Sequence, residues 1–169
     1  AQRIVTDHIR TSVFMIADGV TPANTDRGYI LRRLLRRAVR YADVLGIEHD
    51  MLSLFVPIIA QKYKGIYNTI TEKAEHIEIE IKAEEDKFRK TLERGMKEFE
   101  KIISEPGDEI SGIKAIGLSA TFGFPVELTG ELAKERGKHV NVGEYLKELE
   151  KHKNLSRTGA EQKFKGGLA

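Results

Sequence analysis

The clearest pattern in the chain is an apolar stripe of helical spacing between residues 24 and 46. Its members follow one another at i, i+3, i+4, i+7, i+11 and i+14, which places on one helix face Leu31, Leu34, Leu35, Ala38, Ala42 and Leu45. Asn24 or Thr25 can cap the N-terminus of such a helix, Asp26 suits its first turn, and Gly46 suits the position after its end. The pattern predicts one amphipathic helix over this stretch.

Two further apolar patterns flank this helix. The first predicts a helix over residues 3–17, ended by Asp18-Gly19, and its face consists of Val5, Ile9, Val13 and Ile16. The second begins at Asp50 and is apolar nearly all round as far as Ile59. It predicts a buried helix that is kinked or restarted at Pro57.

The longest predicted helix runs from about residue 69 to about residue 103. Apolar residues recur there every three or four positions, and Glu, Lys and Ala fill most of the positions between them. Glu84 and Glu85 interrupt the apolar stripe once. At about 1.5 Å per residue, a helix of this length would extend on the order of 50 Å.

A smaller set of helices is predicted after the break at residues 104–108, whose sequence is Ser-Glu-Pro-Gly-Asp. Ser111 can cap a short helix. Pro125 suits the first position of the next helix, which should run to about Arg136 and end at Gly137.

A last helix is predicted over residues 142–152. Asn141 and Glu144 have the spacing of a capping box, and Val140 and Tyr145 are placed for a hydrophobic staple. These four residues mark the start of the helix.

Together these elements predict an all-α fold: a multihelical bundle with one long helix and a smaller C-terminal helical subdomain. We expect residues 1–104 to form the bundle and residues 105–153 the subdomain. Residues 154–169 have little to bury and are expected to be a linker toward a further domain, since the chain has the character of a piece of a longer protein.

Composition excludes several classes of site. The net charge is only +2, so an anion-binding surface requires local segregation of charge. The absence of cysteine excludes disulfides and thiolate metal sites, and no apolar run reaches the roughly 18–20 residues of a membrane span. No serine or histidine has a nucleophile context, so we predict no catalytic residue. We predict no metal site either, because no i,i+4 pair occurs among His8, His49, His76, His139 and His152.

Charge is segregated on the stretch of the first stripe. Between its first and last arginine there is no carboxylate, and the six arginines are Arg27, Arg32, Arg33, Arg36, Arg37 and Arg40. The last four should project opposite the apolar stripe. A solvated helix face is the simpler reading, but such faces usually mix charges of both signs. A face of one sign favours an anionic partner, and we expect this partner to be a nucleic-acid backbone.

Several strings, in order and spacing, resemble the region that follows the catalytic domain of alanyl-tRNA synthetases. They are TDHIR at 6–10, ADGVTPAN at 17–24, RGYILRR at 27–33, LRRAVR at 35–40, FGFPVELT at 122–129 and FKGGLA at 164–169. The resemblance covers nearly the whole chain. It implies a mostly helical module that grips the acceptor stem of tRNA(Ala) while a separate class II domain aminoacylates the end of that stem.

The resemblance also implies how the stem is recognised. In the family, identity rests mainly on a G·U wobble pair, whose guanine amino group lacks its usual partner in the shallow minor groove of A-form RNA. The loop asparagine of the family matches Asn24, beside Asp26, and the six arginines of the helix would contact phosphates. A second reader, often aspartate, falls at Ala120, which cannot accept a hydrogen bond. Three alternatives follow: Asn24 acts alone, Ser119 or Thr121 substitutes, or discrimination of the wobble pair is weaker.

Further expectations follow from the same resemblance. The ATP- and magnesium-binding motifs and the zinc cluster of the editing domain would lie outside this chain, so we expect no cofactor in it and no activity from it alone. The expected partners are the acceptor stem and the adjacent catalytic and editing domains, in the cytoplasm and without a membrane. Two alternatives remain open: a structural spacer whose arginines dock on neighbouring domains, and a coiled-coil partner module built on residues 70–103.

Overall fold

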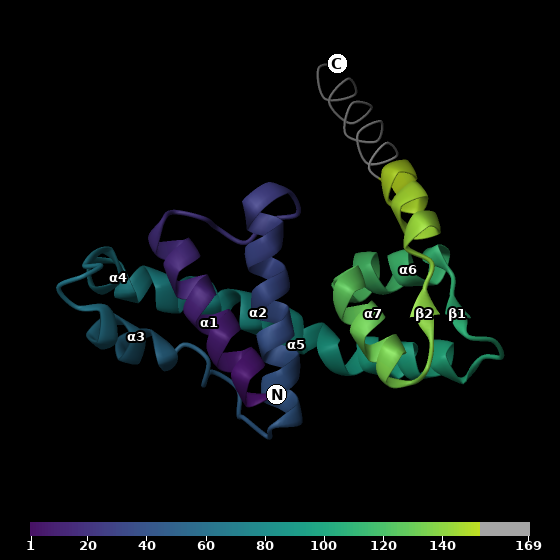
Figure 1. Ribbon diagram of the computed structural model, residues 1–169, viewed down its shortest axis with the longest axis horizontal. Coiled ribbons are helices and arrows are strands. Elements are labelled where there is room, and N and C mark those ends of the chain that lie inside the picture. Colours follow the sequence, from purple (N-terminus) through teal and green to yellow (C-terminus); the bar gives the residue numbers. More distant parts are fainter. Residues whose placement is uncertain (153–169) are drawn as a thin grey trace, which may run out of the picture. The chain divides into compact units, whose positions relative to one another are not determined.

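The computed structural model describes residues 1–152, and these divide into two compact units, one ending at Glu93 and the other beginning at Arg94. The division falls inside a long helix that contributes to both (Figure 1). Helices dominate each unit, so the all-α prediction is confirmed. The predicted domain boundary at residue 104 stays a prediction, and the predicted linker lies outside the described residues.

The first unit is built from α1 (Gln2–Ala17), α2 (Asp26–Val44), α3 (Phe55–Tyr63), α4 (Thr69–Glu72) and the first two-thirds of α5 (Ala74–Ser104). The helix α1 packs along α2, and its predicted face is buried, with Ile9, Val13 and Ile16 fully inaccessible. Gly19, with φ +85°, follows the end of α1 as predicted.

Two predictions for this unit need correction. Pro57 lies in the first turn of α3, where its missing N–H costs nothing; of the two predicted alternatives, the helix is not kinked but begins close to Pro57, at Phe55. It is not buried all round, because Leu54 and Ile58 are 55% and 66% exposed. The long helix predicted from residue 69 is interrupted at Lys73, which separates α4 from the 31 residues of α5.

The second unit holds α6 (Gly112–Phe122), α7 (Val126–Glu135) and a helix over residues 142–152, with the end of α5. The helices were predicted at these places, and Ser111 caps α6 by accepting from the Lys114 N–H at 3.4 Å. The sequence did not predict β1 (Glu109–Ile110) and β2 (His139–Val140), which form a two-stranded parallel sheet.

The predicted capping box at the last helix forms only in part. The Glu144 N–H donates to Asn141 Oδ1 at 2.9 Å, and Tyr145 is buried with Val140 packed against it, as a hydrophobic staple requires. The Glu144 carboxylate accepts from the Gly112 N–H instead of returning to Asn141, whose own N–H donates to Ile110 O in the sheet. In the described part of the chain, no helix is long and apolar enough to cross a membrane.

Candidate nucleic-acid interface

The loop between α1 and α2 is packed tightly against the start of α2. The Ala23 N–H donates to Gly28 O at 3.1 Å, and a Cβ added at Gly28 would lie only 2.6 Å from Thr21 O and 2.5 Å from Ala23 Cβ. Glycine is therefore the residue that lets the loop approach the helix this closely. Asn24 is exposed at the end of this loop. Thr25 occupies the N-cap position of α2 with an extended backbone, as one of the two expected residues, but its side chain makes no capping hydrogen bond.

Arg32 ties this loop to the rest of the unit. Its Nη1 donates to Asn24 Oδ1, its Nη2 donates to Pro22 O at 3.5 Å, and its Nε lies 3.4 Å from Glu84 Oε1 on α5. The planar guanidinium thus spans two points of the loop and one carboxylate, which is a geometry that arginine suits. The side chain of Arg32 is 21% exposed.

Arg36 forms a close ion pair with Glu84 on α5. Its Nε and Nη2 lie 2.7 and 2.6 Å from Glu84 Oε1, and its guanidinium lies 5.4 Å from the centre of the Phe88 ring. The two side chains of the pair are 13% and 2% exposed. Burial lowers the pKa of Arg36, and the Glu84 charge opposes this shift. Since arginine titrates far above neutrality, it stays charged.

The remaining arginines of α2 also have neighbours. Arg37 Nη1 lies 2.7 Å from His8 Nε2 on α1, and the Arg37 guanidinium lies over the Tyr41 ring. Arg40 Nη1 lies 3.7 Å from Asp43 Oδ2. Arg33 is half-buried.

The prediction of an arginine face opposite the stripe therefore needs correction. Arg36 is directed into the unit against α5, and the helix has a second packed side in addition to its apolar stripe. The stripe itself is buried at Leu31, Leu35, Ala38 and Ala42, whereas Leu45 is 37% exposed. The neutralising carboxylate comes from Glu84, 48 residues after Arg36 in the chain, so no local reading of the arginine stretch could find it. The acidic interruption of the long apolar stripe was the available signal.

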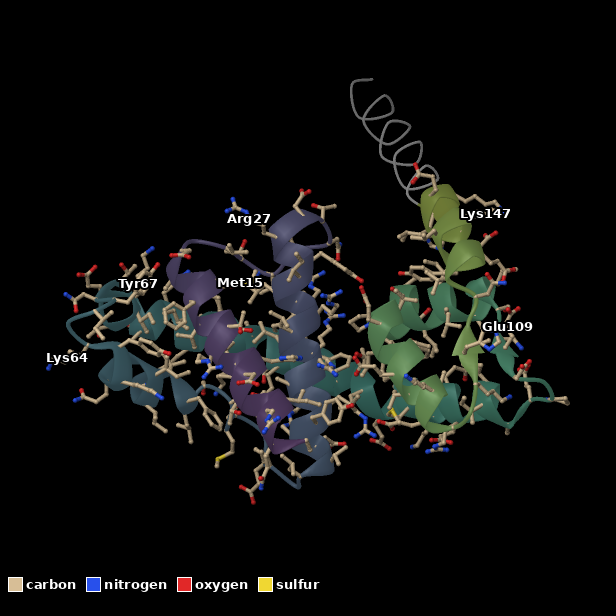
Figure 2. All side chains as sticks on the ribbon, in the orientation of Figure 1. Met15, Arg27, Lys64, Tyr67, Glu109 and Lys147 are labelled. Atoms are coloured by element: carbon tan, nitrogen blue, oxygen red, sulfur yellow. The ribbon has the colours of Figure 1, made fainter. Side chains whose placement is uncertain are left out.

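Arg27 differs from the other arginines of the helix. It is exposed, and within residues 1–152 no hydrogen bond or ion pair of its side chain is found. Figure 2 shows it at the N-terminal end of α2, close in sequence to Asn24 and Asp26. Asp26 itself adopts φ +52°, an unusual conformation for a residue other than glycine, at the turn into the helix.

The residues expected as second readers belong to the other unit. Ser119, Ala120 and Thr121 form the last turn of α6, with Ala120 and Thr121 exposed. Gly123 follows as the C-cap of the helix with φ +69°, and Phe124 is fully buried. Asn24 and Ala120 lie in different units, and each unit is described by itself. Whether the two residues act on the same base pair therefore stays a prediction.

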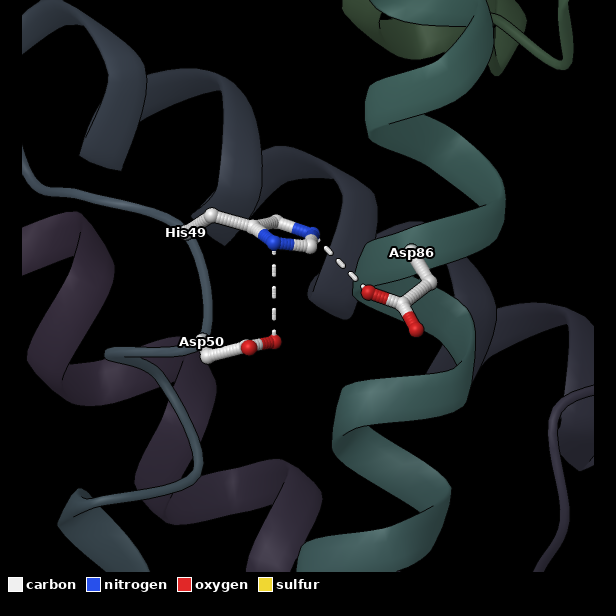
Figure 3. Close-up of side chains that lie close together, drawn as sticks. All are labelled: His49, Asp50 and Asp86. Carbon is white, nitrogen blue, oxygen red and sulfur yellow. Dashed lines mark ion pairs between the residues drawn. The ribbon is translucent and has the colours of Figure 1, made fainter.

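One cluster of potential metal ligands was not foreseen. His49 Nε2 lies 2.8 Å from Asp86 Oδ1, and His49 Nδ1 lies 3.6 Å from Asp50 Oδ1 (Figure 3). Asp50 also accepts from Lys82 Nζ at 3.0 Å, and this bond raises the pKa of Lys82. Lys82 already pairs with Asp50, and His49 lies between the two carboxylates, so these contacts join the segment after α2 to α5. No spacing signal links Asp86 to the other two residues.

The sequence is similar to known proteins along nearly its whole length. Residues 1–167 match the family model described as tRNA synthetases class II (A). The chain is 42% identical over 170 residues to the alanine–tRNA ligase of Borrelia hermsii and 44% identical over 170 residues to that of Borreliella afzelii; each alignment covers 99% of this chain and 29% of the relative.

A third relative, the alanine–tRNA ligase of Acetivibrio thermocellus, is 41% identical over 165 residues, covering 95% of this chain and 19% of the relative. The chain therefore spans less than a third of the length of these relatives. Their similarity extends over both units, so it includes the α2 region and the α6–α7 turn. The chain belongs to the class II (A) tRNA synthetase family, and within that family it resembles part of the alanine–tRNA ligases.

Proposed function

We propose that this chain is the part of an alanine–tRNA ligase that binds the acceptor stem of tRNA(Ala) and distinguishes its G·U wobble pair. The observation that carries the proposal is the placement of Asn24: exposed, on a loop packed against the start of α2, with its side-chain oxygen held by Arg32. An amide oxygen has two lone pairs, so it can accept from Arg32 and from a guanine amino group together.

In this proposal the arginines of α2 have different tasks. Arg27 is exposed beside the loop and contacts backbone phosphate, together with the N-terminal end of α2. Arg32 and Arg36 are committed to Glu84 and contribute mainly by holding the loop and the helix. Ser119 and Thr121, on either side of Ala120, remain the candidates for a second contact to the stem.

Binding of an RNA minihelix with the acceptor-stem sequence should be detectable by fluorescence titration at low salt and should weaken steeply as salt is raised. Arg27→Ala should weaken binding of G·U and G·C stems alike and make the slope of log K against log salt shallower by about one, the contribution of one phosphate contact. Arg10→Ala is the matched control, because Arg10 is exposed on α1 and already paired with Asp7 at 2.7 Å. Absence of binding at low salt would refute the proposed function.

Asn24→Ala should lower the preference for a G·U stem over a G·C stem by about 1–3 kcal/mol, a magnitude taken from direct readout of base edges in DNA. The affinity for the G·C stem should change little, because no phosphate contact is removed. Asn68→Ala serves as the control: Asn68 is an exposed asparagine whose Oδ1 accepts from the Gly65 N–H. An unchanged preference in Asn24→Ala would show that another residue reads the pair.

The alternative function, a spacer that docks on neighbouring domains, is favoured by a different observation. Ile58 in α3 and Ile66 just after it are 66% and 82% exposed. Large apolar side chains that are exposed close together are typical of a surface that another protein domain covers. This alternative also expects the arginines to dock on neighbouring domains. The pairing of Arg36 with Glu84 inside the unit argues against that part of it. This alternative would be favoured if the chain bound no RNA in the titration but did bind the catalytic domain of one of its relatives.

A further inference from the structure

We infer that Arg32 and Glu84 are positioning residues for the recognition loop: the buried Glu84 holds Arg32, and Arg32 fixes Asn24 and Pro22 in the geometry that reads the stem. The inference rests on the proposed function of Asn24. It assigns to Arg32 a role in specificity in place of the phosphate contact expected from the sequence.

The contacts of Arg32 support this assignment. Each side of its guanidinium faces an acceptor of the protein: Glu84 Oε1, Asn24 Oδ1 and Pro22 O. These contacts involve three of the five N–H groups of the guanidinium, and the side chain that carries the other two is only 21% exposed, which limits its access to a phosphate. Because two of the three acceptors lie on the loop, releasing Arg32 would also release the side chain of Asn24.

Arg32 links Glu84 to the loop of Asn24, and in this link Glu84 is the residue that is fixed by burial. Its side chain is 2% exposed on α5, inside the core of the first unit, and its Oε1 lies near both Arg32 and Arg36. Glu84 therefore cannot touch RNA directly. Any effect of Glu84 on discrimination between stems has to pass through the arginines that it holds.

The contacts at Gly28 make the link stiff. The Ala23 N–H donates to Gly28 O in the first turn of α2. Arg32, one turn further along α2, donates to Pro22 O and Asn24 Oδ1. Two positions of α2 therefore hold the loop. A side chain held before binding loses less conformational entropy when it meets its ligand. This favours discrimination by Asn24 without any contact from Arg32 to the RNA.

The first test is a binding comparison on the full chain. Arg32→Ala should lower the preference for the G·U stem about tenfold, within the range of one base contact, and should leave the salt slope unchanged. The double variant Asn24→Ala/Arg32→Ala should lose no more preference than Asn24→Ala, because both changes act through the same amide. Equal weakening of G·U and G·C stems, with a slope shallower by about one, would overturn the inference and leave the proposed function standing.

Two further variants separate positioning from general loss of structure. Arg32→Lys should recover part of the preference, because an ammonium can donate to Asn24 but cannot span all three acceptors. Glu84→Gln, which keeps the shape of the side chain, should lower the preference with circular dichroism unchanged. A Glu84→Gln chain that is folded and retains the full preference would exclude Glu84 from the link.

The last test does not depend on RNA. In ¹⁵N-labelled protein, the side-chain NH₂ resonances of Asn24 should shift in Arg32→Ala and stay in place in Arg10→Ala. Unshifted Asn24 resonances in Arg32→Ala would overturn the inference. If the unaltered chain binds no stem, the proposed function fails, and these resonances still show whether Arg32 holds the loop.

Discussion

Replacing Glu84 with alanine should lower the free energy of unfolding of the first unit by about 3–5 kcal/mol, the cost of removing one partner from a buried ion pair. Arg36 would keep its charge with 13% of its side chain exposed and without the carboxylate 2.6 Å away. The contact with Phe88 would remain, but a cation–π contact contributes only about 0.5–2 kcal/mol. Urea denaturation followed by far-ultraviolet circular dichroism measures the change.

Two controls sharpen this prediction. Glu75→Gln, on an exposed position of the same helix, should change stability by no more than about 0.5 kcal/mol. The double variant Glu84→Leu/Arg36→Met should be much more stable than Glu84→Ala, because apolar side chains can replace a buried ion pair at little cost. A loss of less than about 1 kcal/mol in Glu84→Ala would show that the pair is screened by solvent.

Gly28→Ala should displace the loop that carries Asn24 and reduce the preference for the G·U stem. The new Cβ would lie 2.6 Å from Thr21 O and 2.9 Å from Ala23 N, and these backbone atoms can yield only if the loop moves. Overpacking of this kind costs about 1–3 kcal/mol. Alanine gains up to about 1 kcal/mol in helix propensity over glycine, so the steric term should win. Urea denaturation and the stem titration measure the two effects.

The matched control is Gly117→Ala in α6. Gly117 is also inside a helix, but an added Cβ would meet nothing within 4 Å. The same substitution should therefore stabilise the chain by about 0.4–1 kcal/mol. If Gly28→Ala stabilised the chain to the same extent and kept the stem preference, the close packing of the loop would have no energetic importance.

The helices were predictable because each has its own local signal. The stripe of α2, the Gly19 and Gly46 endings, the Ser111 cap and the pairing of Asn141 with the Glu144 N–H all depend on residues within a few positions of one another. The exposure of Ile58 was not predictable in this way. An apolar run shows that side chains are hydrophobic, but not how many sides of the helix find a neighbour.

The candidate site was predicted only in its location. The sequence, with its resemblance, identified the loop of Asn24 and the arginines of α2. It gave no indication that Arg32 would donate to Asn24 or that Arg36 would be largely buried. The interruption of an apolar stripe by Glu84 was noticed, yet its partner lies 48 residues away and has no sequence spacing to reveal it.

The sequence by itself therefore determined most of the helices and several of their ends, and it indicated the family, because hydrophobic period, capping and motif order are local properties of the chain. The tertiary structure decided the charge of the α2 surface. Six arginines with no carboxylate between the first and the last of them suggest a face of one sign, but packing against α5 brings Glu84 to Arg36 and Arg32. The physical reason is that a charge that is buried away from water requires a partner. Tertiary packing determines which residue is that partner, and the two can be far apart along the chain.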